Sequence, residues 1–225
     1  MKKLFIILAG LSLTVISCSD GLGKSEEKKD VIVKKFDPEN LPDGVVDMGV
    51  SVAWATYNLG ASNTKQTGNV YKWGEVNTSN NDDETRYRFY SSSSEEYTKY
   101  NSSDKKRALD PEDDAATVLL GEGWRIPTYA EWNELLFYCT HERWQEGNVV
   151  GVKLTSKING QELYFLDHYN FNTMWGANIR ANQSDDYSTV SICWVLEFPG
   201  VLDCFSGMSP RYSRAHIRPV YSECR

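Results

Sequence analysis

Short apolar runs separated by turn residues dominate the chain from Gly44 onward and predict a strand-rich fold. Residues 45–50 and 52–56 are rich in β-branched and aromatic side chains, with a turn between the two runs. Residues 70–73, which precede Gly74, form a third run of the same kind. We therefore expect three short strands in the first part of this domain.

The clearest helical pattern in the chain follows Pro127. Thr128 stands three residues before Glu131, a spacing at which each side chain bonds the free backbone N–H of the other residue and closes the first turn of a helix. A helix is therefore expected to begin at this point. Its buried face would carry three apolar residues, Trp132, Leu135 and Leu136.

A second, shorter helix is predicted to start near Pro111. Three acidic residues follow this proline at 112–114, where the positive end of a helix stabilises negative charge. The next residues, 115–119, are mostly apolar.

Beyond Cys139 the pattern becomes mostly β. Apolar or alternating runs occur at residues 149–154, 162–166, 189–198 and 201–205. Residues 217–221 form a last strand that would close the sheet. Because Pro219 has no N–H to donate, we expect that strand to lie at a sheet edge.

Two polar stretches interrupt these elements. Residues 19–43 hold many charges and too few apolar groups to offset the entropy of ordering, so they are interpreted as a flexible tether. Residues 77–107 are rich in serine, asparagine and aspartate and predict a long surface excursion outside the core. This excursion also carries four tyrosines, Tyr87, Tyr90, Tyr97 and Tyr100.

The N-terminal residues have the pattern of an export signal. Lys2 and Lys3 precede the uncharged run 4–16, which is too short to cross the roughly 30 Å core of a bilayer as a helix. Residues 15–18 resemble the lipobox of bacterial lipoproteins, in which the cysteine, here Cys18, is acylated after the preceding peptide is removed. Several acyl chains anchor a protein stably. The alternative is ordinary cleavage after Ser17, which would leave Cys18 as a free thiol.

These patterns divide the chain into a lipoprotein signal peptide at 1–17, a flexible tether at 18–43 and one exported domain at 44–225. The expected location is the cell envelope, at the outer membrane surface, with the membrane as a partner through the lipid anchor. The formal net charge of the chain is −7, and removal of the signal peptide makes it more negative. An acidic domain of this kind argues against a nucleic-acid partner.

Motifs that would carry catalysis are missing from the sequence. The three histidines, His141, His168 and His216, stand far apart and lack the spacing of metal ligands. No Gly-x-Ser-x-Gly elbow, phosphate-binding loop or dinucleotide fingerprint is present. We therefore expect a domain that is not an enzyme, with no catalytic residues, no cofactor and no metal.

The cysteines that follow Cys18 are even in number, as is common in exported proteins that form disulfides. Cys193 and Cys204 are the preferred pair, because they flank Pro199-Gly200, a turn signal that would fold their strands into a hairpin. The other connectivities remain open, and so does the alternative that the thiols stay reduced and buried. The four residues concerned are Cys139, Cys193, Cys204 and Cys224.

Five motifs occur along the exported domain in a characteristic order. They are Val46-Asp47-Met48-Gly49, Trp54-Ala55-Thr56, Trp73-Gly74-Glu75, Gly123-Trp124-Arg125-Ile126-Pro127-Thr128 with Glu131-Trp132, and Ile217-Arg218-Pro219-Val220. Together they resemble the Fibrobacter succinogenes major paralogous domain, over residues 45–222. The order of all five is more specific than any one of them.

That family is similar to C-type-lectin-like domains and, more distantly, to formylglycine-generating enzymes, whose Arg-Leu-Pro-Thr-x-x-Glu-Trp signature looks like residues 125–132. The resemblance implies an α+β fold of the C-type-lectin-like kind: a twisted antiparallel sheet with two helices and long loops. It also implies scaffold roles for five residues, with Trp124 and Trp132 in the core, Pro127 and Thr128 at a helix start, and Arg125 holding a loop.

Calcium is a further candidate ligand, because lectins of this fold hold the ion with carboxylates and amides next to a proline. The sugar-binding signatures Glu-Pro-Asn and Gln-Pro-Asp are absent from the chain. The acidic residues at 110–114 cluster where a helix start favours acids in any case. We favour the helix start and assign no metal site.

Recognition of a ligand at the surface is the remaining function class. In segment 169–187, Trp175 offers a large ring, while Asn178 and Arg180 offer amide and guanidinium donors. Rings stack on apolar faces and amides bond hydroxyls or backbone groups, although a solvated loop has a similar composition. The sequence thus predicts a surface-tethered, non-enzymatic binding module for a glycan or a protein. The alternative is a structural or assembly component of a cell-envelope complex.

Overall fold

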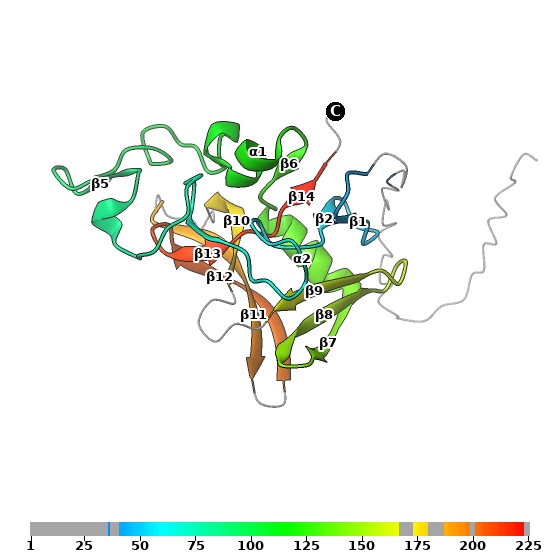
Figure 1. Ribbon diagram of the computed structural model, residues 1–225. Coiled ribbons are helices and arrows are strands. Elements are labelled where there is room, and N and C mark those ends of the chain that lie inside the picture. The colour runs from blue at the N-terminus through cyan, green and yellow to red at the C-terminus, as the bar shows by residue number, and fades with distance from the viewer. Residues whose placement is uncertain (1–35, 37–40, 167–172, 180–186, 199–200, 223–225) are drawn as a thin grey trace, which may run out of the picture. The chain divides into compact units, whose positions relative to one another are not determined.

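The computed structural model describes residues 36, 41–166, 173–179, 187–198 and 201–222. All of them belong to the unit Val33–Arg225. Within the described residues the fold is mixed α+β and strand-rich, with four sheets and two α-helices (Figure 1). None of the described helices is both long enough and apolar enough to cross a membrane.

The largest described sheet has five strands in the order β12-β11-β10-β13-β3. The runs predicted at 189–198 and 201–205 form β11 and β12, which pair antiparallel from Thr189 opposite Pro210 to Phe198 opposite Val201. β10 and β13 are parallel neighbours, and the other pairs are antiparallel. The strands are β3 (Val70–Lys72), β10 (Thr173–Ile179), β11 (Thr189–Phe198), β12 (Val201–Pro210) and β13 (Arg214–His216).

A second sheet has four short strands in the order β1-β2-β14-β6. The last strand of the chain, β14, therefore lies between two neighbours, and the prediction that it would occupy an edge is wrong. The reason is that Pro219 stands just before the strand, where no ladder N–H is required, and its carbonyl accepts from the Ala55 N–H at 2.9 Å. The strands are β1 (Val45–Val46), β2 (Ala53–Ala55), β6 (Trp124–Arg125) and β14 (Val220–Tyr221).

Two smaller sheets complete the described strands. The runs at 149–154 and 162–166 form the second and third strands of a sheet in the order β7-β8-β9, as their alternation predicted. β4 (Tyr90–Ser91) pairs with β5 (Glu96–Tyr97) inside the excursion at 77–107. The three-stranded sheet consists of β7 (Cys139–Glu146), β8 (Val149–Ser156) and β9 (Glu162–Leu166).

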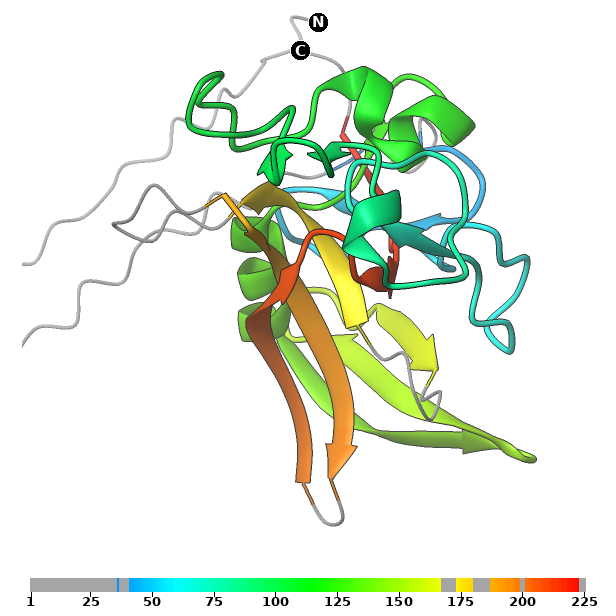
Figure 2. The same cartoon turned by 90° about the vertical axis from the view of Figure 1, so that its left-hand side faces the viewer.

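Helix α2 (Tyr129–Tyr138) confirms the capping box that the sequence predicts. The Thr128 hydroxyl accepts from the Glu131 N–H at 3.2 Å, and a Glu131 carboxylate oxygen accepts from the Thr128 N–H at 2.7 Å. Trp132 and Leu135 are buried, and Leu136 packs beside them. Figure 2 shows α2 lying behind the strands of the five-stranded sheet.

The first helix is shorter than its sequence pattern predicts. Residues Pro111–Asp113 form a separate 3₁₀ turn, η2, and α1 (Ala115–Leu120) begins only after Asp114. The Asp114 carboxylate accepts from the N–H groups of Ala116 and Thr117, so it caps α1 and marks the break between the two elements. Another 3₁₀ turn, η1 (Glu84–Arg86), lies in the excursion.

A buried indole N–H connects the two hydrophobic clusters of the domain. Trp132 and Trp54 lie in one cluster, with ring centroids 4.6 Å apart, and Trp73 and Trp175 lie in the other. The Trp132 indole donates to the Trp175 carbonyl at 3.2 Å, and the Trp175 indole donates to the Tyr71 carbonyl at 2.7 Å. The first of these hydrogen bonds joins the two clusters, and the second lies within the cluster that holds Trp175 and Tyr71.

The domain starts earlier than residue 44. Phe36, which falls within the predicted tether at 18–43, is only 4 % exposed and counts among the buried apolar residues. Leu41 and Pro42 line a hollow together with residues of β1. The boundary between tether and domain drawn from composition is therefore placed too late, because a single buried ring inside a polar stretch leaves little trace in composition.

Candidate binding surface

Trp175, chosen from the sequence as a ligand-stacking ring, is completely buried. It lies in β10, where the four consecutive residues from Met174 to Ala177 are buried. Its indole N–H is already used by the Tyr71 carbonyl. The ring cannot reach a ligand from solvent, so this assignment is wrong: the strand has both faces covered, and the residue is part of the core.

Of the other two predicted ligand residues, the structure describes only Asn178. Asn178 is half-buried in β10 and forms an isolated bridge with Ala108, which directly follows the excursion at 77–107. Arg180 lies outside the described residues. The described residues therefore favour the tyrosine-bearing excursion over segment 169–187 as the ligand site.

The hairpin predicted around Cys193 and Cys204 is present, and its backbone register is known. Cys193 is opposite Ser206, and Cys204 is opposite Val195. The two cysteines therefore occupy diagonal positions on neighbouring strands instead of a directly opposed pair. The disulfide between them stays a prediction. Cys139 is a buried free thiol, and burial raises its pKa to about 11.

The described histidines do not come together. His141 lies on the exposed strand β7, and His216 is buried on β13, with its Nδ1 3.0 Å from the Asn69 carbonyl oxygen. His168 lies outside the described residues. The arrangement offers no convergent pair of imidazoles in the described part of the chain.

Aromatic side chains give the excursion at 77–107 an interior of its own. Tyr87, Phe89 and Tyr100 are at most 5 % exposed and join the hydrophobic cluster around Trp73. Their rings meet edge to face, with Tyr87 and Phe89 centroids 5.6 Å apart and Phe89 and Tyr100 centroids 5.5 Å apart. The prediction that the excursion lies outside the core is therefore wrong for Tyr87 and Tyr100, although its serine-rich turn is exposed.

Arg211 fastens this excursion to the five-stranded sheet. Its guanidinium is fully buried and donates to the carbonyls of Lys99 and Tyr100 and to the hydroxyl of Tyr87, at 2.9, 2.9 and 3.2 Å. It also lies 4.3 Å from the centre of the Tyr97 ring. A buried cation is thus stabilised by carbonyl dipoles and aromatic faces, and these contacts fix the position of residues 87–100.

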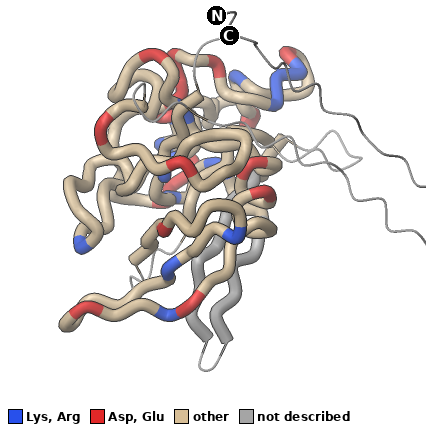
Figure 3. The backbone as a smooth tube through the Cα atoms, turned by 90° about the vertical axis from the view of Figure 1, so that its right-hand side faces the viewer, with Lys and Arg blue, Asp and Glu red and all other residues tan. Residues whose placement is uncertain are grey.

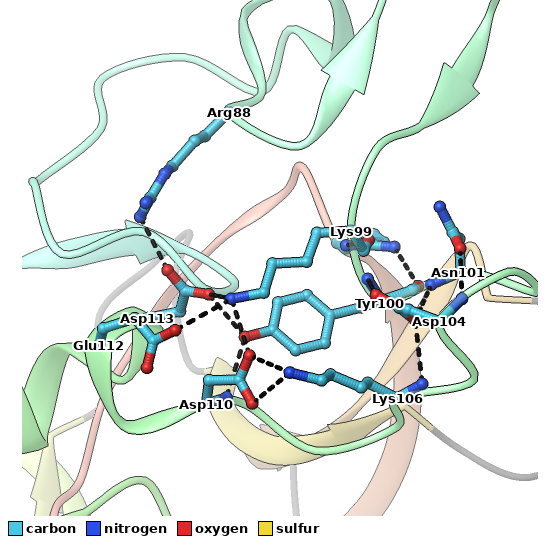
Figure 4. Close-up of polar contacts among 10 residues, drawn as sticks. Arg88, Lys99, Tyr100, Asn101, Asp104, Lys106, Asp110, Glu112 and Asp113 are labelled. Atoms are coloured by element: carbon cyan, nitrogen blue, oxygen red, sulfur yellow. Dashed lines mark hydrogen bonds and ion pairs between the residues drawn. The ribbon is translucent and has the colours of Figure 1, made fainter.

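A second charged group, the Lys99 ammonium, lies between the excursion and η2 (Figure 4). It pairs with Asp110 at 2.8 Å and with the fully buried Asp113, and it makes a longer contact of 3.4 Å with Glu112. Hydrogen bonds with Asp110 and Asp113 outweigh the burial of the ammonium and raise the pKa of Lys99, which therefore stays charged at neutral pH. The lysine acts as a built-in counterion for the acidic residues.

The same acidic residues could form a cation site by distance alone, since one oxygen from each of Asp110, Glu112 and Asp113 lies within 4.8 Å of the others. The cluster is, however, already neutralised from three sides. Lys99 occupies its centre, Lys106 pairs with Asp110 at 2.7 Å, and Arg88 pairs with Asp113 at 3.0 Å. A metal ion would have to displace these groups, so the residues present do not fit calcium, and we assign them a structural role.

The turn after Tyr100 is held by one carboxylate. Asp104 accepts hydrogen bonds from the backbone N–H groups of Tyr100, Asn101 and Lys106, at 2.7 to 2.9 Å. Burial alone would raise the pKa of Asp104, but these donors outweigh it and hold the pKa below its ordinary value. The turn is thereby rigid even though most of its side chains are exposed.

Beside this turn lies an open hollow of about 320 Å³. Its two rings, Tyr97 and Tyr187, come from the excursion and from the chain that leads into β11. Arg107 lies over Tyr187, 4.4 Å from the ring centre. The remaining lining groups are carboxylates, amides and hydroxyls, namely Glu95, Glu96, Asn101, Ser102, Ser103 and Ser188.

This combination of groups suits a polar ligand better than an apolar one. Hydroxyl and amide groups donate and accept hydrogen bonds, and carboxylates accept them. The half-buried Tyr97 ring provides apolar surface beside these groups, whereas Tyr187 is only 8 % exposed. Because Asp104 and Arg211 order the backbone beneath the hollow, its groups are arranged before a ligand arrives, which lowers the entropic cost of binding.

No family model, curated protein or solved structure matches the chain. The proposed function therefore rests on the structure of this chain alone. Sequence reasoning missed Arg211, because an isolated arginine in Ser-Pro-Arg-Tyr-Ser has no motif around it. The tyrosines at 87–100 could have indicated a buried cationic partner, since aromatic ring faces attract arginine and lysine side chains.

Proposed function

We propose that this chain is a surface-tethered, non-enzymatic binding module whose ligand surface is the hollow beside Tyr97 and Tyr187. The ligand class is a glycan or a hydroxyl-rich protein surface, and the module is held at the cell envelope, on the outer membrane, through acylated Cys18. The observation that carries the proposal is the ordered excursion, in which buried Arg211 and Asp104 fix the backbone while serine, amide and carboxylate groups stay exposed.

The proposed fold is of the C-type-lectin-like kind. Support comes from the motif residues, which act as scaffold where they are described. The Arg125 guanidinium pairs with Glu131 and donates to the Ile126 carbonyl, so it holds the loop before α2. Trp124 differs from its expected role, because it is half-buried and meets Tyr221 edge to face, with ring centroids 5.5 Å apart, instead of lying in the core.

Arg218, from the last motif, has a similar structural role. Its buried guanidinium donates to the side chain of Asn58 and to the carbonyls of Ala55 and Tyr164, so it joins β2 to β9. It also lies 4.1 Å from the centre of the Phe165 ring. The motif residues thus support the proposed fold, and most of the proposed binding surface lies in the excursion, between the third and fourth motifs.

A glycan array and a pull-down from envelope extract test the proposed binding. Ser102→Trp places a large side chain in the hollow and is expected to lower the affinity for a captured ligand about tenfold or more, equivalent to about 1.4 kcal/mol. Ser92→Trp is the matched control, because Ser92 is exposed on the same excursion outside the hollow. Arrays and pull-downs that stay blank at high protein concentration, or equal losses in both variants, would contradict the proposal.

The second candidate function is a structural or assembly role in an envelope complex. The exposed apolar end of α1 favours it, because Val118, Leu119 and Leu120 are 44 to 52 % exposed on one short helix. In the same pull-down, a stoichiometric protein partner that is lost in Leu119→Asp and kept in Ser102→Trp would support assembly over ligand binding.

A further inference from the structure

Exposed apolar side chains also occur where α2 meets the turn between β8 and β9. Phe137, near the end of α2, is 70 % exposed, and Ile158, in the turn, is 37 % exposed. Lys157 connects them, because its backbone N–H donates to the Tyr138 carbonyl at 2.8 Å and its ammonium donates to the Phe137 carbonyl at 2.9 Å. We call Phe137, Lys157 and Ile158 the junction surface.

The junction surface lies next to residues 47–49, near the start of the continuously described part of the chain. The Asn159 amide donates to the Asp47 carbonyl at 2.8 Å, and the Ser156 hydroxyl donates to the Met48 carbonyl at 2.7 Å. Ile158 packs so closely against Gly49 that a Cβ there would lie 2.8 Å from its Cγ2 atom. The same turn contributes Asn159 to a hollow of about 480 Å³ that residues 41–47 line on the other side.

We infer that the junction surface rests on the lipid bilayer that holds the anchor, an inference that depends on the proposed acylation of Cys18. The tether that the sequence predicts runs from Cys18 to Phe36, which is buried in the domain five residues before Leu41. Leu41 lines the hollow beside this surface. A flexible chain of that length spans roughly 25 Å on average, so it keeps the surface at a high effective concentration next to the membrane. An apolar contact that is too weak to bind the membrane by itself is then sufficient to hold the junction surface against the bilayer.

The side chains present suit the boundary between headgroups and acyl chains. A phenylalanine and an isoleucine enter the apolar side of that boundary, and a lysine keeps its charged end at the headgroups. Figure 3 shows acidic and basic residues interspersed along the backbone on this side of the molecule. Asp43 and Asp47 lie close by, so the contact is apolar in origin and shows little preference for anionic lipid.

Paramagnetic relaxation in lipid nanodiscs tests the inference with the purified lipoprotein. The protein carries labelled isoleucine and leucine methyl groups, and the phosphatidylcholine nanodiscs contain a gadolinium-chelate headgroup lipid. Ile158, identified by Ile158→Val, is compared with Leu119 of α1, which is 52 % exposed and lies away from β8 and β9 in Figures 1 and 2. We expect the Ile158 methyl to relax several-fold faster than the Leu119 methyls.

Two variants and one mass measurement complete the design. Phe137→Ser should bring the relaxation of Ile158 down towards that of Leu119, whereas Leu119→Ser should leave Ile158 unchanged. Equal relaxation of the two residues in the unmodified protein, or no effect of Phe137→Ser, overturns the inference while the anchor stands. A mass spectrum without fatty acid on Cys18 overturns both the anchor and the inference.

Discussion

At the scale of single residues, the domain depends on buried guanidinium groups whose described partners are carbonyls and rings. Arg211 and Arg218 are 0 % and 3 % exposed. Burial lowers the pKa of Arg218 to about 9, which still leaves it charged at neutral pH. Burying each guanidinium costs desolvation energy. Each arginine nevertheless donates to carbonyl groups of segments that are far apart in sequence, and these hydrogen bonds specify how the segments meet.

Replacing Arg211 by methionine should destabilise the protein by about 3 kcal/mol, because the carbonyls of Lys99, Tyr100 and Tyr187 lose their donor. Arg211→Lys should also be destabilising, since one ammonium cannot replace a planar fork of donors. Urea unfolding measures both. Arg86→Met is the control, because the Arg86 side chain is 72 % exposed, and it should change stability by less than about 0.5 kcal/mol. Similar losses in Arg86→Met and Arg211→Met would contradict this role.

At the scale of elements, the start of α2 shows how far local sequence determines local structure. The spacing of Thr128 and Glu131 predicts the capping box, and both hydrogen bonds form. Glu131 has a second role that spacing does not reveal, because its carboxylate also pairs with Arg125 of β6. By contrast, the pattern around Pro111 predicts one helix where a 3₁₀ turn and a short α-helix form, because Asp114 caps a new helix in place of continuing the old one.

The Arg125–Glu131 pair predicts a specific pH dependence. Burial alone would raise the pKa of Glu131, but Arg125 and the Thr128 N–H outweigh it and hold the pKa below the ordinary value of 4.5. A carboxyl with a lowered folded-state pKa contributes stability that is complete above its unfolded pKa and is lost as the pH falls through the folded pKa. Part of the stability lost below about pH 4.5 therefore belongs to this residue.

Glu131→Gln should remove that contribution, so its stability should fall less steeply than that of the unmodified protein below pH 4.5. Chemical denaturation at a series of pH values measures the difference. Glu96→Gln, at an exposed position, serves as the control. Parallel curves for Glu131→Gln and the unmodified protein would show that the ion pair contributes nothing to acid stability.

At the scale of the whole molecule, packing decides which residues belong to the domain. Phe36 is buried although its neighbours in sequence are charged or polar, and Trp175 is buried although the segment around it is rich in amides. Composition averages over neighbours, whereas burial is decided one side chain at a time by what lies across from it. For this reason the structure places the start of the domain earlier than composition predicts, and it places Trp175 in the core instead of at a ligand surface.

The length of chain needed for full stability follows from Phe36. A chain that begins at Val33 should be more stable than one that begins at Leu41 by about 2 kcal/mol, because only the longer chain buries that ring. Urea unfolding of the two chains measures the difference. Phe36→Ala in the longer chain should reproduce most of the loss, and Lys35→Ala should not. Equal stability of the two chains would return the domain boundary to residue 44.

The sequence by itself determined the local features of this protein: its strand-rich α+β class, the capped helix at Thr128, the hairpin at 189–210 and the absence of familiar catalytic motifs. These features depend on interactions between residues close together in sequence, so short sequence patterns predict them. Only the tertiary structure decided that Trp175 is core, that β14 is an inner strand, that Lys99 neutralises the acidic cluster and that Arg211 orders the excursion. Each of these depends on contacts between residues distant in sequence, from 11 positions for Lys99 and Asp110 to 111 for Arg211 and Tyr100, and no local pattern records such contacts.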